Sequence, residues 1–282
     1  MQFRNALGVA RGCGIRTVYL PGFRWIKEGV HELPCGTRLV NLLGAVFDDE
    51  LVLLVGRFFD ISSLEGFAPQ PLTCHEAIGA IGHLVILDRD REPLEEDHLV
   101  IHLRAGDIFS GGNVHPNYGQ PPLAFYLRVL EEGPWRRVTM MAQDEGNPVW
   151  NPLRQFASAA FPTEAFTGRP LQQDLEFLLR ARSLVAPSGT FCRGVAAMSG
   201  NLALVHSFDE TFDPWGNAAV GVVRWVDTAG TYREQLLSRN WRNSPDQRDL
   251  MIRYPGRHID PVSGAPQSLG PSGNQSPHPS II

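Results

Sequence analysis

A chain of 282 residues, 43% of them hydrophobic and 20% charged, is long enough for two α/β domains and too apolar to be disordered throughout. Its 25 basic and 30 acidic residues give a net charge of -5, which excludes a general nucleic-acid-binding surface but allows a local basic pocket. No apolar run reaches the roughly 20 residues that cross a bilayer, and the first residues lack a secretory signal, so we expect a cytoplasmic protein without a membrane span.

The first part of the chain carries short signals of helix and strand. Spaced apolar residues predict a helix over residues 5–14, and residues 16–21 are typical of a strand that a proline ends. The apolar runs 51–55 and 84–87 are strand-like by composition, although a buried helix could have the same composition.

From residue 98 onward, strands and helices alternate regularly. The predicted strands cover residues 98–103, 138–142, 184–186 and 202–206, and the predicted helices cover residues 121–132, 147–160, 171–183 and 190–199. This alternation predicts an α/β fold with a parallel sheet, in which ligands bind at the carboxyl ends of the strands. From residue 255 the composition changes to Pro, Gly, Ser and Gln, so we expect residues 255–282 to form a disordered tail.

The strand at residues 98–103 leads into polar residues whose chemistry suits an anion. His102 and Arg104 are two residues apart, so their side chains project from the same face as the strand ends. An arginine is rarely buried without a partner, and Gly106 permits a sharp turn after it. Asp107 could pair with Arg104 in a structural ion pair that shapes the loop, or the arginine could serve a bound anion.

A second candidate site lies between the strand at 184–186 and the helix that follows. Ser188, Gly189 and Thr190 stand where a strand ends and a helix begins, so hydroxyls and free backbone N–H groups could bind an anion there. Alternatively, Ser188 or Thr190 could simply cap the helix, and both roles are compatible.

These two regions together resemble a known family. The run His102-Leu-Arg-Ala-Gly-Asp107 resembles the His-x-Arg-x-Gly-Asp motif of the GDP-fucose-dependent fucosyltransferases of the α1,2, α1,6 and protein O-fucosyl types. Asp174, followed by a strand and the run Ser188-Gly-Thr-Phe191, resembles a second region of that family. The resemblance implies a GT-B fold of two Rossmann-like domains that face a cleft, with residues 1–97 on the acceptor side and residues 98–254 on the nucleotide-sugar side.

The resemblance also implies roles for single residues, with a GDP-sugar as donor substrate, a glycan as acceptor and no cofactor. Arg104 resembles the arginine that clamps the β-phosphate, and His102 resembles the neighbouring histidine that orients the donor. Asp174 resembles the acidic residue near the nucleoside, and Ser188 and Thr190 resemble the hydroxyls on the pyrophosphate. Gly189, between these two hydroxyl residues, and Phe191, directly after them, complete the expected donor site. The implied activity is inverting transfer of fucose to a glycan hydroxyl without a metal ion.

Two further loops offer residues that could bind the substrates. His115, Tyr118 and Gln120 could hold the acceptor, although a turn braced by prolines would explain them equally well. Gln143 follows the next strand and could contact the nucleotide. The general base that takes the acceptor proton could be Asp107 or His115.

Two alternatives stand beside this interpretation. The family begins with a strand and a Gly-Asn-Gln loop, whereas residues 1–5 start almost at the first helix, so either the amino terminus is clipped or that loop is absent. The chain could therefore be a non-catalytic relative that binds a nucleotide or glycan. It could also be a metal-dependent GT-A enzyme that uses Asp88 and Asp90, although such a spacing is more typical of a solvated acidic loop, and we expect no metal site.

Overall fold

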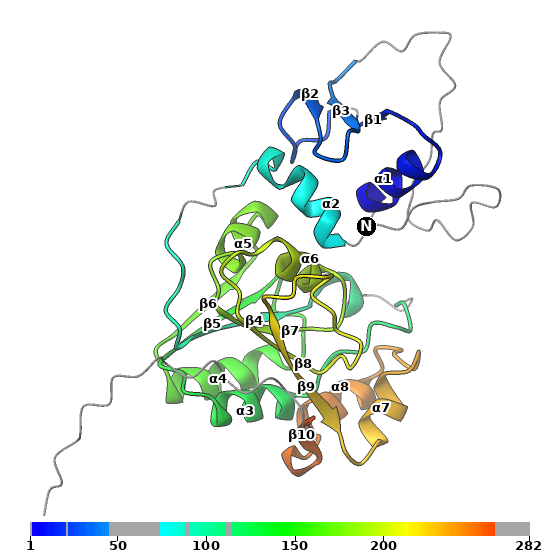
Figure 1. The fold of residues 1–282 in the computed structure, drawn as a ribbon. Helices are drawn as coiled ribbons and strands as arrows, with labels where there is room; N and C mark the ends of the chain where they lie inside the picture. The colour runs from blue at the N-terminus through cyan, green and yellow to red at the C-terminus, as the bar shows by residue number, and fades with distance from the viewer. Residues whose placement is uncertain (1, 21, 45–73, 88–90, 111–113, 263–282) are drawn as a thin grey trace, which may run out of the picture.

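The computed structural model describes residues 2–20, 22–44, 74–87, 91–110 and 114–262, which form two units with separate sheets (Figure 1). The amino-terminal unit consists of α1 (Gln2–Gly12), β1 (Thr17–Tyr19), β2 (Gly29–Glu32), β3 (Arg38–Asn41), α2 (Cys74–Ile81) and a 3₁₀ turn (Gly82–Leu84). β3 is the central strand, parallel to β1 and antiparallel to β2. These elements bury a small core of their own around Leu7, Leu39 and Leu84.

The carboxyl-terminal unit is built on a seven-stranded sheet in the order β10-β9-β8-β7-β4-β5-β6. Its strands are β4 (His98–Leu103), β5 (Arg137–Ala142), β6 (Thr163–Thr167), β7 (Ser183–Ala186), β8 (Leu204–Ser207), β9 (Gly221–Asp227) and β10 (Ile259–Pro261). Neighbouring strands are parallel except for β9 and β10. Without β10, the order read from β6 is the 3-2-1-4-5-6 order of a Rossmann fold.

Helices cover both faces of this sheet (Figure 1). One face carries α3 (Leu123–Glu132) and α4 (Trp150–Ala160), the other carries α5 (Leu171–Leu178) and α6 (Phe191–Met198), and α7 (Thr231–Leu236) and α8 (Pro245–Arg253) pack together near β9. β4 supplies Leu99, Ile101 and Leu103 to the core under α3 and α4, and Val100 to the core under α5 and α6. A strand that is apolar on both faces is typical of a parallel sheet covered by helices.

The strand order creates a switch point beside β4. The chain runs outward from β4 through β5 to β6, then crosses back to place β7 on the other side of β4. The loops that follow β4 and β7 therefore leave the sheet in opposite directions, and ligands of doubly wound α/β proteins bind in the crevice between such loops.

The structure confirms the predicted α/β class and the parallel sheet, and differs in some element boundaries. The helix expected over residues 171–183 ends at Leu178, because Ser183 already pairs with β4 and the chain needs the intervening residues to turn. The run 84–87 is not a strand, since a 3₁₀ turn ends at Leu84 and Val85 makes an isolated bridge to Ile26. The run 51–55 lies outside the described residues.

The expected disordered tail does not begin at residue 255. Residues 256–258 form a 3₁₀ turn, and β10 pairs antiparallel with β9 through Ile259 and Asp260. Ile259 is completely buried, so one apolar side chain anchors a segment of otherwise polar composition. Residues 255–262 belong to the folded unit, and residues 263–282 lie outside the described residues.

The two units meet through helices. α2 of the amino-terminal unit packs against α6, which follows β7 (Figure 1). Among the described residues of that unit, the strands form a small mixed sheet and not the parallel sheet of a complete Rossmann domain. The described residues contain no helix with the length and apolar character needed to span a membrane.

Two truncations test whether residues 255–262 belong to the folded unit. Ending the chain after Val262 should leave the melting temperature within about 2 °C of the full chain, whereas ending it after Tyr254 should lower the melting temperature by roughly 5–15 °C, because the second truncation removes the buried side chain of Ile259. Thermal unfolding followed by circular dichroism measures both. Equal melting temperatures for the two truncations would show that β10 contributes nothing to stability.

Candidate functional site

A cavity of about 430 Å³ opens at the carboxyl ends of β4 and β7, at the switch point. Of the residues predicted from sequence, those that line it are His102, Arg104, Asp107, Gln143, Asp174, Ser188, Gly189 and Phe191. They come from the end of β4, from the loops after β4, β5 and β7, and from α5 and α6. The described residues of the amino-terminal unit do not line this cavity, so its walls belong to the carboxyl-terminal unit.

Arg104 is the central cation of the cavity. Its side chain is 26% exposed, and Nη2 lies 3.5 Å from Oδ1 of Asp107, whose own side chain is 75% exposed. The guanidinium carbon lies 4.2 Å from the ring centre of Tyr118, close enough for a cation–π contact. Nε of Arg104 is buried and makes no hydrogen bond within the described part of the chain. The guanidinium is thus held in place while part of its hydrogen-bonding capacity is unused.

Two glycines make room for this arrangement. Gly189 has a φ of 134°, and a Cβ at this position would lie 3.2 Å from Nη1 of Arg104. Gly106 has a φ of 71°, and a Cβ there would collide with the side-chain amide of Gln143. The positive φ at both positions favours glycine, and a side chain there would also displace the end of the Arg104 or Gln143 side chain.

Asn147 holds the backbone of Arg104 and was not identified from the sequence. It is buried, its Nδ2 donates to the carbonyl oxygen of Arg104 at 2.9 Å, and its Oδ1 accepts from the N–H of Val149 at 2.9 Å. The start of α4 is thereby fixed to the end of β4. An asparagine near a helix start is a common capping residue, so its sequence position alone did not distinguish this role.

His102 stands beside Arg104 and is neutral at physiological pH. Burial, and secondarily the charge of Arg104, lower the pKa of His102 to about 4. Its Nδ1 lies 3.5 Å from Sγ of Cys192 in the first turn of α6, and its ring centre lies 5.0 Å from that of Phe191. His102 is therefore suited to hydrogen bonding rather than to carrying a positive charge.

The two hydroxyl residues predicted to bind the donor, Ser188 and Thr190, have different surroundings at the start of α6. Ser188 lines the cavity, whereas Thr190 is exposed, does not line it and makes no hydrogen bond that caps the helix. The structure therefore does not place Thr190 in the wall of the cavity, and its contact with the ligand stays a prediction. The first-turn N–H groups of α6 remain available at the cavity, since helix starts have no intrahelical acceptors for them.

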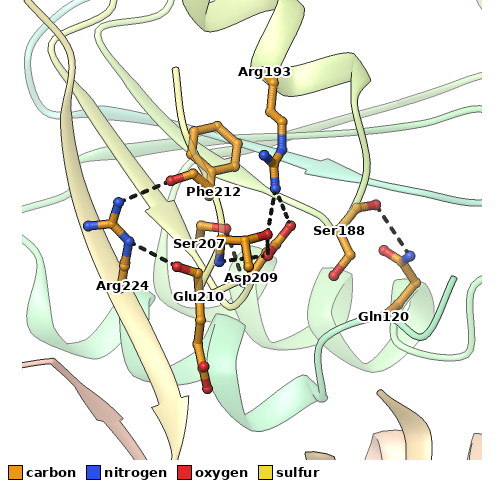
Figure 2. Close-up of polar contacts among 9 residues, drawn as sticks. Gln120, Ser188, Arg193, Ser207, Asp209, Glu210, Phe212 and Arg224 are labelled. Atoms are coloured by element: carbon orange, nitrogen blue, oxygen red, sulfur yellow. Dashed lines mark hydrogen bonds and ion pairs between the residues drawn. The ribbon is translucent and has the colours of Figure 1, made fainter. Parts of the chain in front are cut away.

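Ion pairs hold α6 in position. Figure 2 shows Arg193 of α6 reaching Asp209 in the loop after β8, where Nη2 of Arg193 donates to Oδ2 of Asp209 at 2.7 Å. The same nitrogen donates to Oγ1 of Thr211 at 3.0 Å. Asp209 also accepts a hydrogen bond from Oγ1 of Thr211, and the hydrogen bonds from Thr211 and Arg193 lower the pKa of Asp209 against the effect of its burial. The helix start that borders the cavity is thus fixed to the neighbouring strand.

A second arginine, Arg169, also lines the cavity, and the sequence analysis did not identify it. Its Nε lies 3.7 Å from Oδ1 of Asp174, and its guanidinium lies 4.6 Å from the ring centre of Phe166. Burial raises the pKa of Asp174, and the charge of Arg169 opposes that shift. A signal was present in the sequence, because Arg169 follows a glycine directly after a strand, but β6 itself was not predicted.

Side chains of the loop after β4 pack against Arg104 and Ser188. Gln120 is completely buried, and its Nε2 donates to the carbonyl oxygen of Tyr118 at 3.0 Å. The same nitrogen donates to the carbonyl oxygen of Ser188 at 3.5 Å (Figure 2). Tyr118 lies under Arg104, and His115 is exposed with its ring centre 5.0 Å from that of Tyr118. Gln120 is thus packed against Ser188 and Tyr118 against Arg104, and the acceptor contacts expected of His115, Tyr118 and Gln120 stay a prediction.

No group of three or more His, Cys, Asp or Glu side chains that could hold a metal ion occurs among the described residues. Asp88 and Asp90, the candidate residues of the metal-dependent alternative, lie outside the described residues.

These features define a Rossmann-like α/β protein with a cationic cavity at the switch point of its sheet. Neither a protein-family model nor a curated protein matches the sequence. Among solved structures, the chain is similar to ADP-heptose LPS heptosyltransferase II of E. coli, with 16% sequence identity and a TM-score of 0.29. The match covers 46% of this chain and 39% of the heptosyltransferase chain, so it spans about two fifths of the latter's length.

Burial of neutral histidines predicts a loss of stability in mild acid. The pKa of His206, like that of His102, is lowered to about 4 by burial, whereas an unfolded histidine titrates near 6.5. Below pH ~6.5 the unfolded chain therefore binds protons that the folded chain does not, and stability should fall as the pH drops from about 6.5 to about 4. Replacing His206 by Gln should reduce the slope of unfolding free energy against pH in this range by about one proton. Urea unfolding at several pH values measures the slope, and an unchanged slope in His206→Gln would contradict the assignment.

Proposed function

We propose that this protein is a glycosyltransferase that uses a nucleotide sugar, and that it transfers fucose from GDP-fucose to a glycan hydroxyl with inversion and without a metal ion. One observation carries the proposal: Arg104 after β4 and the start of α6 after β7 border the same cavity at the switch point. The α/β fold with a Rossmann-like sheet agrees with the GT-B architecture that the sequence motifs imply.

The chemistry of the cavity suits departure of a diphosphate. When the bond between a sugar and a nucleoside diphosphate breaks, negative charge grows on the departing phosphate oxygens. The forked guanidinium of Arg104 can donate two parallel hydrogen bonds to those oxygens, and the N–H groups at the start of α6 add further donors. Donors that are fixed before the reaction stabilise such charge without reorganisation, and here Tyr118, Asn147 and Gly189 fix the arginine.

The finer assignment of donor rests on the resemblance of the sequence motifs to those of GDP-fucose-dependent enzymes. Asp174 and Gln143 also line the cavity and would contact the nucleoside. The amino-terminal unit would hold the glycan acceptor, and α2 against α6 would join the two units. Asp107 and His115 are both exposed near Arg104 or Tyr118, and either could take the acceptor proton.

Replacing Arg104 by Ala tests the proposal directly. The affinity for GDP should fall by roughly tenfold to a hundredfold, since the charged hydrogen bonds to phosphate are lost, and transfer should be abolished. The GDP affinity and transfer activity of Arg104→Lys should lie between those of the unmodified protein and those of Arg104→Ala. Lysine keeps the charge but cannot bind in a forked geometry. Calorimetry with GDP and a donor-hydrolysis assay measure these effects.

The matched control is Arg136→Ala. This arginine is 85% exposed and lies at the amino end of β5, opposite the cavity, so its loss should change neither binding nor turnover. If Arg104→Ala binds GDP as tightly as the unmodified protein, the proposed role of the arginine fails. Tight GDP binding without turnover in the unmodified protein would favour the non-catalytic alternative.

A thermal-shift screen identifies the nucleotide. At concentrations about a hundredfold above its dissociation constant, a ligand stabilises the folded state by roughly 3 kcal/mol, which raises the melting temperature by several degrees. We expect GDP to give a larger shift than UDP or CDP, and we expect transfer to proceed in the presence of a chelator. A larger shift with UDP would overturn the assignment of the donor, and inhibition by the chelator would favour the metal-dependent alternative.

A further inference from the structure

The two ring nitrogens of His102 have different surroundings. Nδ1 lies 3.5 Å from the sulfur of Cys192, which is within hydrogen-bonding distance for a thiol. Nε2 makes no hydrogen bond with the described residues, and His102 itself lines the cavity. Phe191 packs against the ring with 5.0 Å between ring centres and so limits its rotation. The contact with Cys192 therefore distinguishes one ring nitrogen from the other.

The ionisation states decide which atom donates in this contact. Cys192 is 1% exposed, and burial raises the pKa of its thiol far above the usual value, so the sulfur keeps its proton. His102 is neutral because burial and Arg104, the charged group beside it, lower its pKa to about 4. A thiol proton therefore faces a neutral imidazole, which has one N–H group and one bare nitrogen.

Of the two possible hydrogen bonds, donation from sulfur to nitrogen is the better one. A bare imidazole nitrogen is a good acceptor, whereas a thiol sulfur is a weak one. If Nδ1 carried the proton, its N–H group would face the poor acceptor. The S–H to Nδ1 arrangement avoids this cost and leaves the imidazole proton on Nε2.

We propose that Cys192 is a positioning residue that holds His102 in the tautomer with the proton on Nε2, so that His102 donates a hydrogen bond to a phosphate oxygen of the ligand and does not act as a base. The identity of that ligand rests on the proposed function, but the tautomer does not. The assignment also excludes His102 as the general base of the proposed transfer, because a histidine whose Nε2 is already protonated cannot take the proton of the acceptor hydroxyl. That proton must go to another group, and Asp107 and His115 are the available candidates.

The tautomer can be measured in the protein without any ligand. Long-range ¹H–¹⁵N NMR spectra of histidine-labelled protein distinguish a protonated nitrogen from a bare one, and His102→Gln identifies the signals of His102. At pH 7 we expect a protonated Nε2 and a bare Nδ1 in the unmodified protein. Cys192→Ser should keep this pattern, because a hydroxyl also donates, whereas Cys192→Ala should give a mixture of both tautomers. The control is Cys13→Ala, which changes an exposed cysteine directly after α1.

Calorimetry with GDP tests the consequence for binding. We expect Cys192→Ala to weaken GDP binding about threefold to tenfold, which corresponds to the loss of one modest hydrogen bond, and Cys192→Ser to restore most of the affinity. A protonated Nδ1 in the unmodified protein, or an unchanged tautomer in Cys192→Ala, would overturn the assignment. A shifted tautomer with unchanged GDP affinity would overturn the donation to phosphate. If the unmodified protein binds no GDP, the proposed function fails while the NMR result still decides the tautomer.

Discussion

The site depends on where a single buried strand ends. β4 is apolar on both faces and lies between β5 and β7, so the packed core fixes its position on every side. Arg104 follows directly after it, at the place where the topology opens a crevice. Contacts from three other segments then hold the arginine: the ring of Tyr118, the amide of Asn147 and the close backbone of Gly189. A flexible cation is thereby converted into a fixed one.

Much of this architecture could be predicted from the sequence because it follows from local rules. Parallel strands alternate with helices, their carboxyl ends meet at one edge of the sheet, and polar residues just after β4 and β7 must therefore converge. This reasoning brought His102, Arg104 and Ser188 to one cavity without knowledge of a single contact. The element boundaries were less accurate, as with α5, because propensity does not reveal where a neighbouring strand must begin.

The parts that could not be predicted depend on contacts between distant segments. Gln120 has a polar side chain in a loop, which suggests a ligand, yet it is buried against the carbonyl oxygen of Ser188. Asn147 has the composition of an ordinary helix start, and only its distance to the Arg104 carbonyl oxygen reveals what it does. β10 lies in a segment whose composition indicates disorder, but one buried isoleucine and pairing with β9 are sufficient to order it. Local patterns contain no information about such partners.

Arg104 and Arg169, the two arginines that line the cavity, form ion pairs that differ in their exposure to solvent. Arg169 and Asp174 are 24% and 17% exposed, so separating them would leave a carboxylate poorly hydrated. Arg104 faces Asp107, which is 75% exposed, and water can replace the arginine around that carboxylate at little cost. Arg104 can therefore release its partner when a stronger anion arrives, whereas Arg169 cannot do so as easily. Under the proposed function, this difference favours placing the diphosphate at Arg104 and the start of α6, and the uncharged nucleoside beside Arg169 and Asp174.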